Sequence, residues 1–435
     1  MEHSMRRPKN GLPIQQRLLS LLTDSTNWLY LLLFYPIIDF VLRKIIPIPI
    51  VSSFWDDGVL VVLLGFALLA YFVNERPLPG IKHVLTAFFV LGLALMVSDM
   101  DNFKVSVEGF RAIYEYVLAF FVGFYLIKST DDLNKYIKVL TFVGFIVGLI
   151  GVLQVALGIE TTQGWVNEGE TMKTRAYSIV TSPNVLGSYM AFIAPIAMGL
   201  VLQSKTTKDR LIWGAMALIV IAALLFTGSR GAWFAFAAVV LFGCSLWNRK
   251  IAVYLLIAGM IGLAALWALP DSTPLVGSVK NRIETLFSAD YWTKSTSDGR
   301  IKRWTDAYNQ MRLEPLFGAG LGHHGGAVGY RHFGTIYTDS YFFKSIAELG
   351  LLGIGLLVTL AVMIIRYCLA LVRRLTNTPH YFLALGVLCG MFAVSLHNLV
   401  ENIFEVPFML IYFWLIGGFV AGLIAEKTKS FPEKR

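Results

Sequence analysis

Long apolar segments, separated by short polar ones, recur along the whole chain. They approach the length of about 17 to 25 residues with which an α-helix crosses a membrane. Unbroken apolar runs exclude the alternating pattern of a transmembrane β-barrel, and a helix satisfies its own backbone hydrogen bonds in lipid. We therefore expect an all-α integral membrane protein, a bundle of about twelve transmembrane helices at residues 28–42, 58–73, 84–97, 107–127, 137–157, 184–203, 211–226, 231–246, 251–269, 341–365, 381–396 and 406–425.

The charged residues between these spans predict the orientation of the chain. Lys and Arg accumulate in short loops that remain in the cytoplasm. Here they gather before the first span, in alternate connections such as 128–138, 205–210 and 366–374, and after residue 426. We expect both termini in the cytoplasm. The net charge of +9 is mainly this orientation signal and not a sign of nucleic-acid binding.

The expected organisation has five parts. They are a cytoplasmic tail (1–27), nine spans (28–269), one large extracytoplasmic loop (270–340), three further spans (341–425) and a second cytoplasmic tail (426–435). A loop of this length is usually functional or disordered, and its Trp, Tyr and Gly residues favour an ordered one. Its residues 298–312 place apolar side chains three and four positions apart, which predicts an amphipathic helix on the membrane or against the bundle.

Composition agrees with a membrane protein and limits its chemistry. Hydrophobic residues make up 56% of the chain and charged residues 15%, so the chain needs lipid to cover its surface. Its three dispersed cysteines predict neither a disulfide framework nor a zinc site. Asp39 and Glu115 fall within spans, where a carboxylate needs a partner, and Arg111 is the partner that we expect for Glu115.

Two arginines occupy short connections on the expected outer side, where arginine is disfavoured. Arg230 follows a Thr-Gly-Ser turn and begins the next span, where its positive charge opposes the helix dipole. A guanidinium beside helix N–H groups is typical of a phosphate site, and the alternative is an arginine that extends to lipid headgroups. Arg175 precedes a Ser-Pro-Asn sequence that favours a helix start; its alternative is an ion pair with Glu168 or Glu170.

The large loop holds the other candidates. Arg300 and Arg303 belong to the expected loop helix, and the alternative is that they form its solvated face. Asp339 ends the loop, where a catalytic role and a helix N-cap are both open. His323 and His324 are adjacent and lack the helical spacing that metal sites favour, so we expect no metal.

Taken together, these segments resemble the O-antigen ligase and polymerase superfamily of membrane glycosyltransferases. The resemblance rests on residues 175–187 (RAYSIVTSPNVLG), 227–233 (TGSRGAW), 300–304 (RIKRW) leading to 315–322 (PLFGAGLG), and 339–343 (DSYFF) followed by 347–353 (AELGLLG). They cover roughly the second half of the chain, whereas the first spans match only as hydrophobic helices. Their combination with about twelve spans and one large outer loop is fairly specific.

The resemblance implies a GT-C-like bundle that moves a glycan from an undecaprenyl-diphosphate carrier to a saccharide acceptor, without metal or other cofactor. It implies the outer face of the bacterial cytoplasmic membrane, inversion at the anomeric carbon, and other membrane proteins of polysaccharide assembly as partners. Arg175, Arg230 and Arg300, with Arg303 as a further member, are then expected to bind the diphosphate, because preorganised cations stabilise the charge of a leaving group.

The chain departs from the ligase pattern at the end of the loop, where that pattern has a His-Asn pair and this chain has Asp339 and Ser340. Asp339 is our candidate for the base that engages the acceptor hydroxyl, acting with Arg230 and Arg300, and His332 or His324 are the alternatives. The departure resembles polymerases of capsule, exopolysaccharide or teichuronic-type polymers. We therefore expect a polymerase of a surface polysaccharide.

Other functions remain open at this point. A ligase would attach the same glycan to a lipid or protein, with the same donor chemistry. A transporter or a flippase of a lipid-linked glycan also has many spans, but such proteins usually show repeated halves, broken helices or charges deep in a central cavity, which we do not find here. A non-catalytic scaffold leaves the arginine set unexplained.

Overall fold

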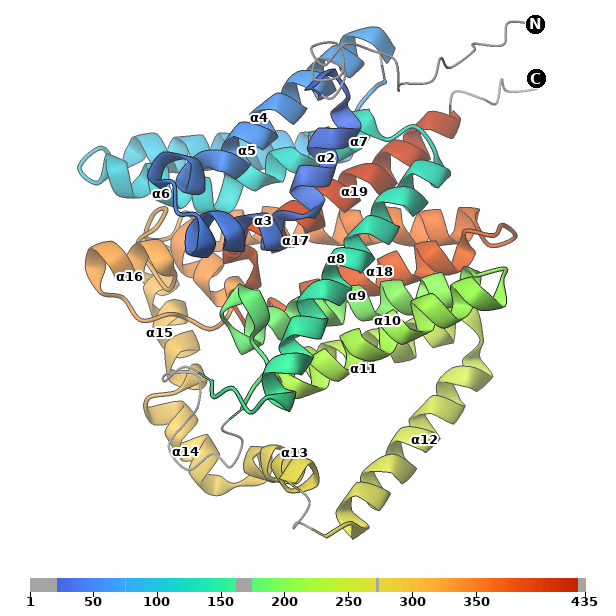
Figure 1. Ribbon diagram of the computed structural model, residues 1–435. Helices are drawn as coiled ribbons and strands as arrows, with labels where there is room; N and C mark the ends of the chain where they lie inside the picture. The colour runs from blue at the N-terminus through green and yellow to red at the C-terminus, as the bar shows by residue number, and fades with distance from the viewer. Residues whose placement is uncertain (1–21, 75, 162–173, 271–273, 429–435) are drawn as a thin grey trace, which may run out of the picture.

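The computed structural model of the protein describes residues 22–74, 76–161, 174–270 and 274–428. Every element within these ranges is helical, and ten helices are long and apolar enough to cross a membrane. The expected all-α membrane architecture is thereby confirmed (Figure 1). The basic residues at the start of the chain, the tail after residue 428, and Glu168 and Glu170 lie outside the described residues.

The long and short α-helices follow one another in this order: α2 (Ser25–Leu33), α3 (Tyr35–Phe40), α4 (Pro49–Asn74), α5 (Ile81–Ser98), α6 (Phe103–Tyr114), α7 (Ala119–Leu126), α8 (Thr130–Ala156), α9 (Pro183–Gln203), α10 (Thr207–Phe226), α11 (Arg230–Trp247), α12 (Arg249–Ala268), α13 (Pro274–Glu284), α14 (Ala289–Ser297), α15 (Arg300–Leu313), α16 (Ala327–Phe333), α17 (Tyr341–Arg374), α18 (Tyr381–His397) and α19 (Pro407–Thr428). Between them lie the π-turn η2 (Val41–Ile45) and the 3₁₀ turns η3 (Glu115–Leu118), η4 (Ser178–Val180), η5 (Thr285–Phe287) and η6 (Ile403–Glu405).

Helix α6, turn η3 and helix α7 together form one of the ten candidate spans, Phe103–Leu126, whereas two predicted spans are not among the ten. Residues 28–42 do not make one helix: α2 ends at Leu33, and Pro36 stands in the first turn of α3. A proline is tolerated in a first turn but has no N–H with which to continue a preceding helix. Residues 381–396 form α18, which has 17 residues and is largely buried.

Glycines allow the central helices α7, α9, α18 and α19 to approach closely. A Cβ on Gly418 of α19 would lie 2.1 Å from the carbonyl oxygen of Phe120, and one on Gly386 of α18 would lie 2.6 Å from that of Pro195 in α9. Small residues at such crossings are typical of membrane helices that pack through their backbones. Several residues of the site described below lie in connections next to these central helices.

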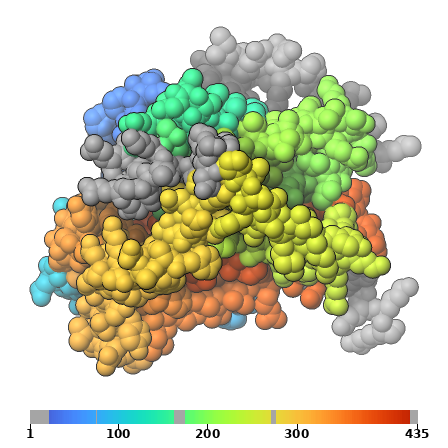
Figure 2. Space-filling model, turned by 90° about the horizontal axis from the view of Figure 1, so that it is seen from below, coloured from blue at the N-terminus to red at the C-terminus, as the bar shows by residue number. Residues whose placement is uncertain are grey.

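Helix α12 and the loop that follows it lie at the edge of the molecule. None of the residues of α12 is buried, and Figure 1 shows it diverging from α9, α10 and α11. Seen from below, α12 to α15 run in sequence across one face of the protein (Figure 2). Four helices, α13 to α16, occupy the described part of the loop, so the loop is partly helical as expected.

The loop is attached to α17 by its backbone. Gly350 interrupts α17 with φ +64°, and a Cβ there would lie 2.5 Å from the backbone of Leu316. The amide of Leu351 donates to Pro315 O at 2.8 Å, and that of Ala319 donates to the carbonyl of residue 347, also at 2.8 Å. Two of the segments that carry the family resemblance, 315–322 and 347–353, therefore lie against each other.

Candidate functional site

A chain of polar contacts begins at Arg175, which is almost fully buried. Its Nη2 donates to Asn184 Oδ1 at 3.2 Å, and Asn184 Nδ2 donates to Glu401 Oε2 at 2.7 Å. The same Glu401 oxygen accepts a hydrogen bond from Arg300 Nη2 at 3.0 Å. Two of the predicted arginines, 125 positions apart in the chain, thus meet through one amide and one carboxylate.

The chain of contacts continues from Arg300 along the start of α15. Arg300 Nε lies 3.9 Å from Asp339 Oδ2, and Arg303 Nη1 donates to the same oxygen at 2.5 Å. The indole of Trp304 stacks on Phe343 of α17, with ring centroids 5.3 Å apart. The start of α15 is therefore fixed against the bundle, and both arginines bind carboxylates instead of forming a solvated helix face.

Arg175 is held in place from three directions. Its amide donates to Thr161 Oγ1 at 2.6 Å, and its Nε donates to Thr227 O at 2.8 Å. The following amide, of Ala176, donates to Phe226 O at 2.9 Å. Backbone and side chain together tie this segment to the end of α10, so the guanidinium is oriented before any ligand binds.

Arg230 is the first residue of α11, as predicted, and it lies beside Arg282 of the large loop. Its Nη1 donates to Arg282 O at 3.3 Å, and its guanidinium lies 4.9 Å from the centroid of the Tyr291 ring, a cation–π distance. Arg282 is buried and its Nη1 donates to Gly228 O at 2.9 Å. Since Arg175 bonds to the neighbouring carbonyl of residue 227, three arginines surround the turn that begins α11.

The interpretation of Asp339 as a helix N-cap is wrong. Ser340 caps α17: its Oγ accepts from the Phe343 amide at 3.2 Å and donates to Leu399 O at 2.8 Å. Asp339 precedes the cap with φ +50°, a left-handed backbone that asparagine and aspartate adopt more readily than most residues. Because Ser340 supplies the cap, the Asp339 carboxylate faces the arginines of α15.

The two histidines proposed as alternative bases make other contacts. His332 Nε2 lies 3.0 Å from Glu108 Oε2 of α6. The backbone amide of His324 donates to Glu348 Oε1 at 3.2 Å, and burial lowers the pKa of its imidazole. Neither histidine is connected by these contacts to the chain of polar contacts that runs from Arg175 to Arg303.

Beneath the site, the glycine-rich loop packs onto a buried ion cluster. Lys344 Nζ lies 2.6 Å from Glu348 Oε2 and 3.4 Å from Glu405 Oε1. A Cβ on Gly326 would lie 1.9 Å from that Glu405 oxygen, so only glycine fits there. A buried cation with two carboxylates needs such close enclosure, because each charge has lost its water.

Glu401 has the most unusual electrostatic environment of the contact chain. It lies in the connection between α18 and α19, and its side chain is only 13% exposed. Burial raises the pKa of its carboxyl to about 7, although Arg300 acts in the opposite direction. A carboxyl group that titrates near neutral pH is characteristic of general acid–base catalysis.

The carboxylates of the amino-terminal helices are paired, as expected. Arg111 Nε lies 2.9 Å from Glu115 Oε2, and Asp39 binds Arg43 at 2.6 Å. Asp56 accepts hydrogen bonds from two tyrosine hydroxyls. These groups stabilise the packing of α3, α4 and α6.

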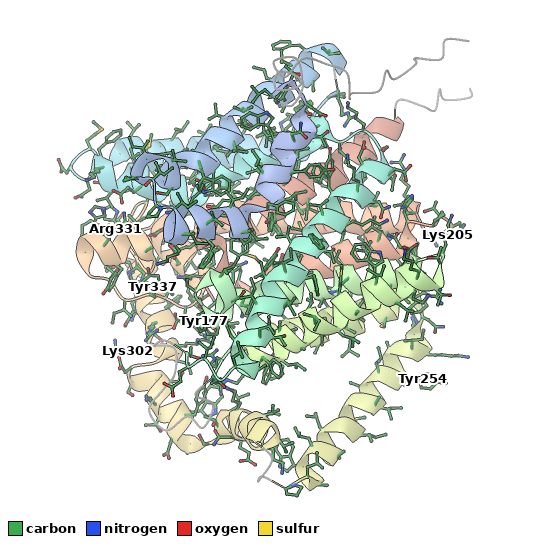
Figure 3. The ribbon with its side chains drawn as sticks, in the orientation of Figure 1. Tyr177, Lys205, Tyr254, Lys302, Arg331 and Tyr337 are labelled. Atoms are coloured by element: carbon green, nitrogen blue, oxygen red, sulfur yellow. The ribbon has the colours of Figure 1, made fainter. Side chains whose placement is uncertain are left out.

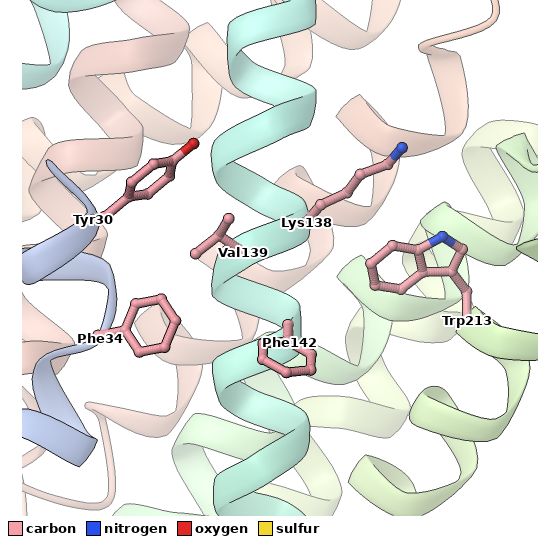
Figure 4. A pocket seen from close by; sticks show the side chains of 6 residues that line it. All are labelled: Tyr30, Phe34, Lys138, Val139, Phe142 and Trp213. Carbon is pink, nitrogen blue, oxygen red and sulfur yellow. The ribbon is translucent and has the colours of Figure 1, made fainter. Parts of the chain in front are cut away.

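A separate groove of about 380 Å³ lies on another part of the surface (Figure 4). Its lining comes from α2 with its cap, α8 and α10, and consists of Tyr30, Phe34, Lys138, Val139, Phe142 and Trp213. Four of these six side chains are aromatic, and none belongs to the arginine set. The groove contributes no reactive group to the candidate site.

The sequence indicated two of the site's members only weakly and a third not at all. Asn184 was visible as part of a family-like segment, and Glu401 as one of several acids in outer connections. Arg282 carried no signal, because a single basic residue in a long loop is ordinary. Their roles depend on contacts between segments far apart in the chain, which periodicity and charge counts do not show.

Comparison with known proteins agrees with this geometry. Residues 215–358 match the family model described as O-antigen ligase, a range that contains Arg230, Arg300, Arg303 and Asp339. No curated protein matches the chain. Over residues 215–358 the family resemblance predicted from the motifs is therefore confirmed.

Proposed function

We propose that this protein transfers a glycan from a polyprenyl-diphosphate carrier, undecaprenyl diphosphate in bacteria, to a saccharide acceptor at the outer face of the cytoplasmic membrane. The observation that carries the proposal is the meeting of Arg175, Arg300 and Arg303 on one chain of polar contacts, inside and beside a segment that matches the O-antigen ligase family. Arg230 flanks this chain at the start of α11.

The donor chemistry explains why several arginines are needed. When the glycan leaves, the diphosphate gains negative charge, which preorganised cations stabilise in a site partly screened from water. Guanidinium groups bind carboxylate and phosphate oxygens with the same planar array of donors. The carboxylates of Asp339 and Glu401 thus occupy donors that the diphosphate would use. Arg303 Nε is buried and, within the described residues, has no hydrogen-bond partner.

The acceptor determines whether the transfer extends a polymer or attaches a finished glycan. We propose a polymerase, in which the acceptor is a second carrier-linked saccharide, because Asp339 and Ser340 replace the His-Asn pair of the ligase pattern. The acceptor hydroxyl needs a proton acceptor within hydrogen-bond reach. Asp339 is the candidate for that role from the sequence, and Glu401 is a second carboxylate of the same contact chain.

Transfer by the purified protein in detergent tests this function. The assay contains polyprenyl-diphosphate oligosaccharide and EDTA, and compares the wild type with Arg175→Ala, Arg230→Ala and the control Arg312→Ala, an exposed arginine at the far end of α15. We expect a ladder of longer lipid-linked glycans that persists in the control and falls by about 10²- to 10³-fold in the other two variants, the usual effect of removing one transition-state donor.

Each other result points to a different function. A full ladder in Arg175→Ala and Arg230→Ala would refute the diphosphate site. A wild-type ladder that requires a divalent metal would refute metal-independent transfer. A folded wild type that extends no carrier-linked glycan but modifies an added lipid or protein acceptor is a ligase, and one that only moves the lipid-linked glycan across liposome membranes is a flippase.

A further inference from the structure

We propose that Glu401 accepts the proton of the acceptor hydroxyl, and that Asp339 instead positions the arginines of α15. This inference rests on the glycan transfer proposed above and names the residue that activates the nucleophile. It starts from the two carboxylates of the contact chain, which contact different nitrogens of the same arginine, Arg300.

Asp339 is bound by the arginines of α15. Its Oδ2 receives a hydrogen bond from Arg303 Nη1 and lies 3.9 Å from Arg300 Nε. Two guanidinium groups therefore engage the same oxygen of this carboxylate. The neighbouring Ser340 cap and the left-handed backbone of Asp339 hold the carboxylate in this position. The arrangement fits a residue that orients Arg303.

Glu401 receives its side-chain hydrogen bonds from one arginine and one amide, whereas two arginines contact Asp339. Both hydrogen bonds that side chains of the described residues donate to it, from Asn184 and Arg300, fall on Oε2. Its Oε1 accepts neither. The carboxylate also accepts a hydrogen bond from the backbone amide of Asn402, and with about four lone-pair sites it retains capacity for a substrate hydroxyl. Burial in the connection between α18 and α19 makes the ionised form less stable than in water and the group correspondingly more basic.

Three charged groups face Glu401 from separate elements, together with the neutral Asn184 of α9. They are Arg300 of α15, Asp339 before α17 and Arg175 before η4. Burial has the largest effect and raises the pKa of Glu401. Arg300, the backbone amide of Asn402 and Arg175 lower this pKa, and Asp339 raises it. The result, a pKa of about 7, leaves a substantial fraction of the residue ionised at neutral pH and able to accept a proton.

Binding of the donor strengthens this base. A diphosphate beside Arg300 competes with Glu401 for the guanidinium and adds negative charge nearby, and both effects raise the affinity of Glu401 for a proton. The proton acceptor is therefore most basic when the donor is in place. This coupling favours reaction in the presence of both substrates.

The two substrates, the arginines and Glu401 account for every bond and for the proton in the transfer step. The acceptor oxygen forms a bond to the anomeric carbon while the bond from that carbon to the diphosphate oxygen breaks. The electron pair of the broken bond leaves with the diphosphate, whose added charge the arginines stabilise. The hydroxyl proton passes to Glu401, which then holds it as a neutral carboxylic acid until products leave and solvent removes it.

The test is a comparison of Glu401→Gln and Asp339→Asn in the purified full-length protein, with polyprenyl-diphosphate oligosaccharide as donor and acceptor. We expect Glu401→Gln to lower kcat by about 10²- to 10⁴-fold, the usual effect of losing a general base, while it binds the donor as well as the wild type does. Asp339→Asn should raise the KM for the donor more than it lowers kcat. Wild-type kcat/KM should rise with pH around a midpoint near 7, and Asp339→Asn should keep this rise with its midpoint moved to lower pH, because the charge of Asp339 raises the pKa of Glu401.

Several results would overturn the assignment. One is a Glu401→Gln variant that keeps kcat within threefold of the wild type. Another is an Asp339→Asn variant that loses both its turnover and the rise of kcat/KM with pH. If Glu401→Gln does not fold, Glu401→Asp replaces it: we expect a folded variant with a displaced pH midpoint, and an unchanged midpoint would contradict us. A wild type without any transfer refutes the proposed function itself, and this inference falls with it.

Discussion

The loop around the site needs glycine for two reasons, backbone conformation and lack of space, and Gly325 and Gly334 differ in the second. Both have a left-handed backbone, with φ +72° and φ +67°. An L side chain tolerates this conformation at a cost of about 1–2 kcal/mol. A Cβ on Gly325 would lie 1.8 Å from Thr338 Oγ1, whereas one on Gly334 would meet no atom within 4 Å. The two positions therefore share the backbone requirement and differ in packing.

We expect Gly325→Ala to destabilise the protein by about 1–3 kcal/mol more than Gly334→Ala, the usual cost of overpacking. The displaced neighbour is Thr338, whose amide donates to Gly325 O at 2.9 Å, so the variant also strains that hydrogen bond. Thermal unfolding of both variants in the same detergent, followed by intrinsic tryptophan fluorescence, measures the difference in Tm. Equal shifts in Tm would show that backbone conformation alone sets the requirement.

At this scale, the sequence predicts residues whose own position is unusual. Arg230 is recognisable because it is a cation at a helix start on the expected outer side. Glu401 is not, because an acid in an outer connection is ordinary, and its importance comes from Arg300, 101 residues away in the chain. The choice between Asp339 and Ser340 as N-cap is similar: both residue types cap helices well, and the backbone decides between adjacent positions.

Helix α15 connects the loop to the bundle through two aromatic positions that differ in environment. Trp304 stacks on Phe343, while Tyr308, one turn further on, is 47% exposed. Ala307 and Met311 are buried on the packed side. The packing of Trp304 should therefore maintain the position of Arg300 and Arg303, and Tyr308 should matter little.

We expect Trp304→Ala to increase backbone hydrogen exchange throughout α15. Truncation of a fully buried aromatic residue typically costs about 3–5 kcal/mol of stability. Trp304 is half-buried, so the cost here should be a part of that. Tyr308→Ala, on the same helix, is the matched control and should leave exchange unchanged. Mass spectrometry of peptides from residues 300–313 measures both. Similar protection of α15 in the two variants would mean that the ion pairs alone hold the helix.

The sequence predicted this helix well and its packing poorly. The three- and four-residue spacing predicted a helix over 298–312, and α15 spans Arg300–Leu313. The same spacing left open whether the apolar face rests on the membrane or on the bundle, because the partner, α17, begins 41 positions after the start of α15. The span predicted at 28–42 failed for another reason: its hydropathy is continuous, but Pro36 divides it.

For the whole molecule, hydropathy predicts which segments are apolar but not which of them face lipid. Helix α12 is as apolar as α9, yet α12 buries none of its residues while most of α9 is buried. Both need apolar side chains, one against lipid and the other against protein, so their sequences look alike. Glycines at close crossings mark the central helices, but only after their partners are known.

The arrangement of charges supports the expected orientation and makes it testable. Figure 3 shows Lys205, in the turn between α9 and α10, at the opposite end of the molecule from Lys302 and Arg331 of the large loop. The charge rule assigns the end with Lys205 to the cytoplasm, because short translocated loops avoid Lys and Arg while a long loop is exempt. The site with Arg300 and Asp339 then faces outward.

Single cysteines introduced at the two ends distinguish the orientations. In a variant whose three native cysteines are replaced by alanine, we expect Ser297→Cys in the large loop to react with a membrane-impermeant maleimide in intact cells. Asn377→Cys, between α17 and α18, should react only after the membrane is opened. Both positions are exposed in the structure, so failure to react reports the membrane side and not burial. If instead Asn377→Cys reacts in intact cells and Ser297→Cys does not, the arginine site faces the cytoplasm. A transferase of externally presented glycans would have no acceptor there, and the proposed function would need a different substrate on that side.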